Sequence, residues 1–224
     1  MSQIFLDPSK AANQPNLNSW IPKGPIPLSL RKFGYCPNFD DWFPGDLVLV
    51  SAIKPDFIAK AIRSVQKKGG YANDDARWEH AAVHIGTGAL CEANRKGVCL
   101  GHIFDYADSH LIRIRRNPLF DKDKGWELAV EALKQKQKNY SYNFSSIVNL
   151  LLNSRNGFWQ AENIKKNRFP KRAVICSELY ADSHVMVCSQ ALGNLRSAEI
   201  TPASLSIEKL LVDVKTNWVK IESL

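Results

Sequence analysis

The chain has 224 residues, of which 45% are hydrophobic and 23% charged, and it carries a formal net charge of +8. This length and balance fit one globular domain with a core, with or without an arm, and exclude a disordered chain. No apolar run reaches the roughly 18 residues of a membrane-spanning helix. The positive charge favours anionic partners, namely phospholipid head groups, cell-wall polymers or nucleic acid, or it is the solvated surface of a basic protein. Of these partners we expect a membrane surface or cell-wall polymer and no nucleic acid.

The N-terminus lacks the basic and apolar regions of a signal peptide, so we expect synthesis in the cytosol, with export by a non-classical route left open. The five cysteines are odd in number and form no CxxC pair. Disulfide frameworks are normally even and denser, so we expect reduced thiols and neither a structural zinc site nor a cofactor.

The first part of the chain predicts an arm followed by one strand and one helix. Residues 1–42 are rich in Pro, Asn and Ser, and they predict an extended arm whose aromatic end packs on a domain formed by residues 43–224. A turn at Pro44-Gly45-Asp46 precedes a short buried strand at residues 47–50. Apolar residues at helical spacing predict an amphipathic helix over residues 55–68.

Short strand-like runs punctuated by glycines come next, and they predict an antiparallel meander. These runs are residues 80–85, 89–93, 97–100 and 110–115. Helical spacing then predicts a helix over residues 121–138, with Trp126, Val130 and Leu133 on its inner face.

The last third of the chain is mostly helical by pattern. A helix is expected at residues 144–152, a polar basic loop at 153–172, and a mostly buried helix over 176–191. Thr201-Pro202 is typical of the N-cap and first position of a short helix, and residues 218–221 would close the sheet as a last strand. The elements together predict an α+β fold, an antiparallel sheet with packed helices.

Cys176 carries the main chemical signal. It lies in the stretch Ile-Cys-Ser-Glu-Leu at the first turn of the predicted helix, where the helix dipole favours the thiolate. A thiolate that acts as a nucleophile needs a base and an orienting group. The alternative is a cysteine that only fills the core.

His80 and Glu92 are the candidate base and orienting group for Cys176. Glu92 follows His80 by twelve positions, and a hairpin centred on Gly86 would place it directly opposite, with Cβ atoms about 5 Å apart. A one-residue slip would send Glu92 to the other face, so a solvated carboxylate and a structural histidine are the alternatives. His80 and His84 share a face, but four strand residues span about 13 Å, which argues against a shared metal.

Six stretches follow one another over about residues 43–210. They read Pro-Gly-Asp-Leu-Val (44–48), Glu-His-Ala-Ala-Val-His-Ile-Gly (79–86), Cys-Glu-Ala (91–93) before Gly-Val (97–98), Asn-Tyr-Ser-Tyr-Asn-Phe (139–144), Ile-Cys-Ser-Glu-Leu (175–179) and Thr-Pro-Ala-Ser-Leu (201–205). In this order they resemble the circularly permuted, YiiX-like branch of the NlpC-type papain-like cysteine hydrolases, which is related to the lecithin:retinol acyltransferase-like proteins. In this branch the catalytic cysteine follows the histidine.

The resemblance implies a permuted papain-like (NlpC-type) fold in which Cys176 is the nucleophile, His80 the base and Glu92 the orienting group. It implies an amidase, peptidase, lipid acyl hydrolase or acyltransferase that acts through an acyl-thioester on a lipid or cell-wall peptide. Tyr142 would line the cleft, and a basic cluster would bring in an anionic substrate: Lys165, Lys166 and Arg168. The alternative, suggested by charge alone, is a non-catalytic module that binds anionic membranes or cell-wall polymers.

Overall fold

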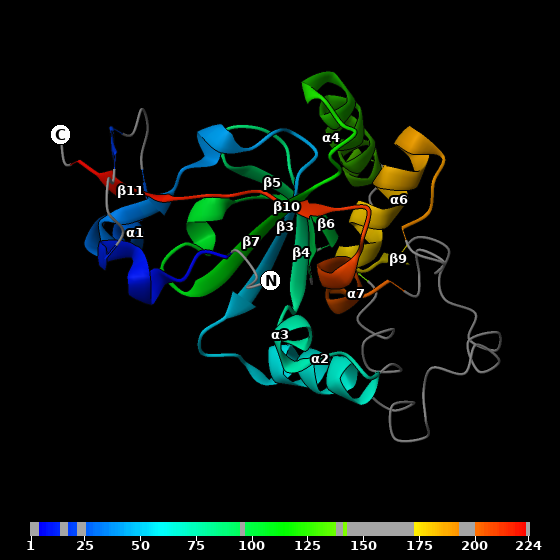
Figure 1. Ribbon diagram of the computed structural model, residues 1–224, viewed down its shortest axis with the longest axis horizontal. Helices are drawn as coiled ribbons and strands as arrows, with labels where there is room; N and C mark the ends of the chain where they lie inside the picture. Colours follow the sequence, from blue (N-terminus) through cyan, green and yellow to red (C-terminus); the bar gives the residue numbers. More distant parts are fainter. Residues whose placement is uncertain are drawn as a thin grey trace.

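A computed structural model describes residues 5–13, 18–21, 26–94, 97–137, 141–142, 173–192 and 200–222. At its centre is a six-stranded antiparallel sheet with the strand order β10-β7-β3-β4-β5-β6 (Figure 1). In chain order the strands are β3 (Leu47–Ala52), β4 (His80–His84), β5 (Ala89–Asn94), β6 (Gly97–His102), β7 (His110–Arg116) and β10 (Val212–Asp213).

The longer helices are packed against one face of this sheet. Helices α4 (Lys122–Gln137) and α6 (Cys176–Cys188) contact each other and strands β4 and β5. Helices α2 (Phe57–Lys68) and α3 (Asn73–Ala76) lie at the end of the sheet where β4 begins, and α3 contacts α7 (Pro202–Ile207) (Figure 1). Alternate residues of the strands form the core with these helices, among them Leu49, Val83, Cys91, Leu128 and Leu179.

The N-terminal region and the last strand cover the opposite face. A small three-stranded sheet has the order β1 (Ser19–Trp20), β11 (Trp218–Ile221), β2 (Tyr35–Pro37). The short helices of this side are η1 (Pro8–Asn13), α1 (Leu28–Phe33), η2 (Phe39–Asp41) and η3 (Ile103–Asp105). Leu6, Leu30 and Trp218 are buried there together with Val48 and Ile112 of the central sheet. The sheet is therefore buried on both faces.

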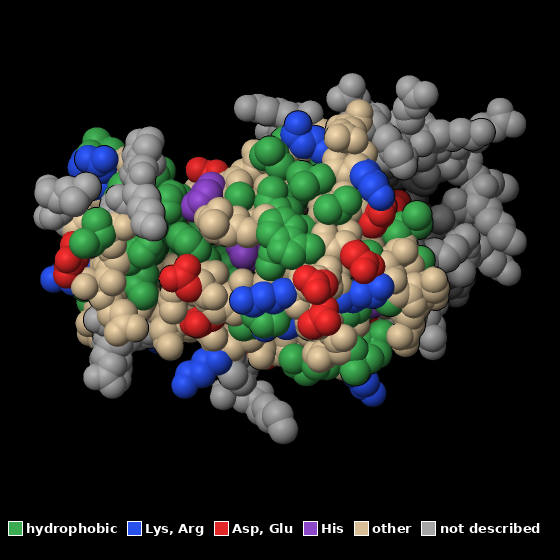
Figure 2. Space-filling model, turned by 90° about the horizontal axis from the view of Figure 1, so that it is seen from above, with side chains coloured by type: hydrophobic (Ala, Val, Ile, Leu, Met, Phe, Trp, Pro, Cys, Tyr) green, Lys and Arg blue, Asp and Glu red, His purple; other side chains and the backbone are tan. Residues whose placement is uncertain are grey.

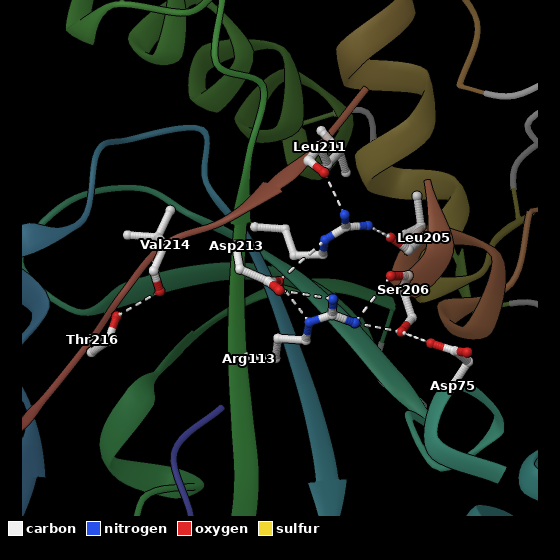
Figure 3. A network of polar contacts seen from close by, with 9 residues as sticks. Asp75, Arg113, Leu205, Ser206, Leu211, Asp213, Val214 and Thr216 are labelled. Atoms are coloured by element: carbon white, nitrogen blue, oxygen red, sulfur yellow. Dashed lines mark hydrogen bonds and ion pairs between the residues drawn. The ribbon is translucent and has the colours of Figure 1, made fainter. Parts of the chain in front are cut away.

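Two arginines of β7 connect this strand to α7 and to its neighbouring strand β10 (Figure 3). Arg113 donates to Asp213 Oδ1 at 2.7 Å and to Ser206 Oγ at 2.7 Å, and Ser206 Oγ donates to Asp75 of α3. Arg115 donates to the carbonyl oxygen of Leu205 at 2.6 Å. Each guanidinium is buried, so the hydrogen bonds offset the cost of removing a charge from water.

Most predicted elements are confirmed, including the α+β class, the strands at residues 47–50 and 80–115, and helices α2, α4 and α6. Thr201 caps α7 as predicted, since its side chain accepts a hydrogen bond from Ser204 N and Pro202 is the first helical residue. The predicted helix at 144–152 and loop at 153–172 lie outside the described residues. The division at residue 42 stays a prediction.

Three expectations are wrong. Strand β7 leaves the meander and pairs with β3, and β11 pairs with β1 and β2 instead of closing the central sheet. Trp126 and Val130 are exposed, because α4 turns Gly125, Leu128, Ala129 and Ala132 inward. Gly125 sets this rotation, since a Cβ there would lie 2.1 Å from the carbonyl oxygen of Pro44.

The exposed apolar residues of α4 belong to a surface groove between α4 and α6. Trp126 and Val130 line it together with Met186 and Val187, and Asp123, Glu127 and Glu131 are also part of it. Figure 2 looks onto this side of the molecule and shows hydrophobic side chains gathered among acidic and basic ones.

Candidate active site

Cys176 and His80 meet where a helix begins beside the start of a strand. Cys176 is the first residue of α6, and His80 is the first residue of β4, against which α6 packs. The two side chains interact, since Cys176 is among the groups that raise the pKa of His80, and Cys176 is only 5% exposed. Glu178 stabilises the beginning of the helix, because its carboxylate accepts a hydrogen bond from Ile175 N at 3.2 Å.

Glu92 is hydrogen-bonded to His80, but in a register that differs from the predicted one. The distance from His80 Nε2 to Glu92 Oε2 is 3.0 Å. Glu92 pairs with Ala82, two residues along β4 from His80, because the turn of the hairpin extends through Thr87 and Gly88, which both have positive φ. A shift of two residues keeps Glu92 on the face of His80, and a long side chain spans the diagonal between them.

Further groups hold the Glu92 carboxylate in place. Tyr106 donates its hydroxyl to Oε2 at 2.6 Å, and Asn94 Nδ2 donates to Oε1 at 3.3 Å. Gly101 of β6 makes room for the carboxylate, because a Cβ there would lie 2.9 Å from Oε1. The sequence analysis did not identify these residues. Gly101 directly follows the predicted strand at residues 97–100, and a glycine in a strand often marks a close approach, which was the one available signal.

The electrostatics of the three residues favour a charged imidazole. Burial lowers the pKa of His80, but the Cys176 thiolate and the Glu92 carboxylate outweigh it and raise the pKa to about 10. Burial raises the pKa of Glu92, but the hydrogen bond and charge of His80, with the Tyr106 and Asn94 hydrogen bonds, hold it below its usual value. Because Nε2 faces Glu92, Nδ1 is left for Cys176. The arrangement therefore supports a protonated imidazole next to an ionised carboxylate.

His84, the other histidine of β4, is engaged in structural contacts. Its Nδ1 lies 2.8 Å from the carbonyl oxygen of Phe43, and its Nε2 accepts a hydrogen bond from Gly88 N at 3.1 Å. These partners assign the proton to Nδ1 and use both ring nitrogens. Burial lowers the pKa of His84 to about 4, so the ring is neutral near pH 7. His84 links the β4–β5 turn to the turn before β3.

A second cysteine–histidine contact lies at the other end of α6. Cys188 Sγ is 3.3 Å from His184 Nδ1, and Asn117 Nδ2 is 3.1 Å from His184 Nε2. Asn117 Oδ1 accepts from Leu119 N, which fixes the amide so that Nδ2 donates to Nε2. Nδ1 then carries the proton, which the carbonyl oxygen of Gln190 accepts at 3.2 Å. The nitrogen that faces Cys188 is therefore a donor and cannot act as its base.

A cleft of about 580 Å³ opens beside His80. Its lining comes from the end of β3, from α2 and from residues 106–110, and it includes His80 and Tyr106. This volume lies in the range of small-molecule sites. Of the predicted nucleophile, base and orienting group, His80 lines this cleft, and Glu92 adjoins it through its hydrogen bonds to His80 and Tyr106.

The remaining predicted site residues are Tyr142 and a basic cluster. Tyr142 belongs to β8 (Ser141–Tyr142), which pairs in parallel with β9 (Ala173–Val174), the segment that leads into Cys176. This brings the backbone of Tyr142 near the start of α6. The predicted basic cluster lies outside the described residues: Lys165, Lys166 and Arg168.

Within the described ranges, no group of three or more His, Cys, Asp or Glu residues is arranged to hold a metal ion. None of the helices in those ranges is long and apolar enough to cross a membrane. The chain matches no protein-family model, and no curated protein matches it significantly.

Proposed function

We propose that the protein is a cysteine hydrolase or acyltransferase of the permuted papain-like type, with Cys176 as nucleophile, His80 as general base and acid, and Glu92 as the orienting group. One observation carries the proposal. A cysteine at the N-terminus of a buried helix lies beside a histidine whose pKa it raises, and Nε2 of that histidine is hydrogen-bonded to a buried carboxylate. This is the arrangement of a catalytic triad, which is identified by geometry and not by order in the chain.

The reaction would proceed in two halves. The Cys176 thiolate attacks the carbonyl carbon of an ester or amide, and His80 Nδ1 passes its proton to the leaving alcohol or amine, which leaves an acyl-thioester. His80 then takes a proton from water or from an acceptor alcohol or amine, which attacks the thioester and releases Cys176. The backbone N–H of Cys176 lies at the helix N-terminus and would donate to the developing oxyanion.

Alkylation tests the thiol first. Iodoacetamide should modify Cys176 rapidly near pH 7, because the imidazolium of His80 stabilises the thiolate, whereas the His80→Ala variant should react slowly. Cys188→Ala is the matched control, since its neighbouring histidine is a donor, and this variant should behave like the parent protein.

Turnover tests the reaction. The parent protein should hydrolyse activated esters, and incubation with extracted lipids and with peptidoglycan should yield new products. Cys176→Ala should lose both activities and keep the circular dichroism spectrum of the parent. If Cys176→Ala retained full activity, the assignment would be wrong. If the parent protein showed neither fast alkylation nor turnover, a non-catalytic binding module would be the better description.

A further inference from the structure

We infer that the cleft beside His80 binds an aliphatic acyl group, so that the acyl donor is an ester or amide of a fatty acid and not a peptide. This inference rests on the proposed function and selects one substrate class for the same site. It is based on the apolar wall of the cleft and on the hydrogen bonds that polar groups of the lining already make within the protein.

The wall of the cleft nearest α2 is apolar. Ile58, Ala59 and Ile62 lie one helical turn or less apart on the same side of α2, and Val50 and Ile53 extend this surface along the end of β3. Ile53 is 49% exposed, so the apolar strip reaches the rim of the cleft. Burial of each methylene against such a surface contributes about 0.8 kcal/mol.

Two of the three acidic side chains in the lining, Glu79 and Asp56, are engaged within the protein, and the third is Asp108. One oxygen of the Glu79 carboxylate accepts from Arg63 Nε at 2.9 Å, and the other accepts from Ala52 N. Asp56 caps α2 by accepting a hydrogen bond from Ala59 N at 2.8 Å. Neither carboxylate needs a substrate group to satisfy it.

Three other polar side chains at or beside the cleft are also engaged within the protein. The Tyr106 hydroxyl is donated to Glu92, and Asn94 Nδ2 is donated to Glu92 and Cys99. Arg63 Nη2 donates to the carbonyl oxygen of Ala52 at 2.6 Å.

The backbone at the end of β3 is paired as well. Ile53 N donates to Ser109 O at 3.0 Å, and Val50 O accepts from Glu79 N at 3.3 Å. A bound peptide gains much of its affinity from hydrogen bonds to its main chain, and these groups offer it little. An acyl chain needs only apolar contact. The scissile carbonyl would lie at Cys176 and His80, and the chain would extend along α2 toward Ile53.

Activated esters of increasing chain length test this inference. Used below their critical micelle concentrations, p-nitrophenyl esters from acetate to octanoate should show kcat/KM rising about fourfold per added methylene until the cleft is filled. Ile62→Ser should reduce the ratio of the octanoate to the acetate value by about tenfold. Ile207→Ser, which changes an exposed isoleucine of α7, should leave both values unchanged.

Binding to an inactive variant gives a readout that does not depend on turnover. Cys176→Ala should bind the fluorescent fatty acid cis-parinaric acid, and Ile62→Ser in that background should weaken binding about tenfold. If the esters are hydrolysed through Cys176 without chain-length preference, and dipeptide p-nitroanilides are preferred, the acyl assignment is wrong while the proposed function stands. If fatty acid binds but Cys176 supports no turnover, the proposed function fails and the cleft assignment survives as a binding site.

Discussion

Replacing Glu92 by glutamine removes one negative charge from the candidate site and keeps the shape of the side chain. The two partners are 3.0 Å apart, with His80 17% and Glu92 7% exposed, so water screens their interaction only weakly. A hydrogen bond to a charged group contributes about 1.5–3 kcal/mol. One pKa unit corresponds to about 1.4 kcal/mol, so Glu92→Gln should lower the pKa of His80 by about 1–2 units.

The sign of the pH effect follows from the raised pKa of His80, about 10. Activity falls at high pH when the imidazolium loses the proton that it gives to the leaving group. Because the carboxylate stabilises the protonated ring, its removal moves this alkaline limb of the kcat/KM profile to lower pH by about 1–2 units. Turnover at the optimum should fall about 10- to 100-fold, less than on loss of the nucleophile.

The difference in unfolding free energy between Glu92→Gln and the parent protein should also depend on pH. A pKa raised on folding stabilises the protein fully below the unfolded-state pKa of histidine, about 6.5, and this contribution disappears as the pH rises through the folded-state value. The deficit of Glu92→Gln in unfolding free energy should therefore be larger at pH 6.5 than at pH 10.5, as measured by urea denaturation.

The pKa itself can be followed by ¹⁵N NMR of the His80 ring. Glu127→Gln is a suitable control, since Glu127 is an exposed residue of α4 paired with Lys124. An unchanged alkaline limb and an unchanged ring titration in Glu92→Gln, with the fold intact, would refute the assignment of Glu92 as the orienting group.

The other predictions concern the neighbours of this pair and one close contact of the fold. His80→Ala should lower kcat by at least about 10²-fold, whereas His84→Ala should mainly lower the melting temperature; the reverse order would exchange their roles. Tyr106→Phe should shift the acid limb of the pH profile to higher pH, because the Glu92 carboxylate loses a donor that lowers its pKa; an unmoved acid limb would make the tyrosine only structural. Gly125→Ala should reduce the unfolding free energy by more than about 1 kcal/mol, the typical effect of a point mutation. The reason is that its Cβ would lie 2.1 Å from a carbonyl oxygen of the turn before β3. A melting temperature equal to that of the parent would contradict this contact.

The sequence predicts local elements well where a periodic pattern and an end signal coincide. Alternation and glycines place β4, β5 and β6, and Thr201-Pro202 places α7. Alternation shows which residues are buried but not which strand lies alongside, so the partners of β7 and β11 were assigned wrongly.

The arm illustrates a second limit of the sequence. Leu6 forms an isolated bridge with Ile112 and is 2% exposed, although it lies in a segment with little periodicity. A single apolar residue in such a segment carries no pattern, so its place in the core depends on tertiary contacts alone.

The residues of the candidate site also differ in whether the sequence can predict their positions. Cys176 and His80 each begin a regular element, and such positions can be inferred from helix and strand signals. Pairing Glu92 with His80 requires only that both lie on one face, and for this reason their side chains are hydrogen-bonded although the register differs by two residues from the predicted one. Tyr106 and Gly101 contact the carboxylate from a turn and a different strand, and their distances from it along the chain carry no period. The alternation of a strand thus predicts which residues lie on the same face of the sheet. Residues that orient the Glu92 carboxylate through tertiary contacts are identified only in the folded protein.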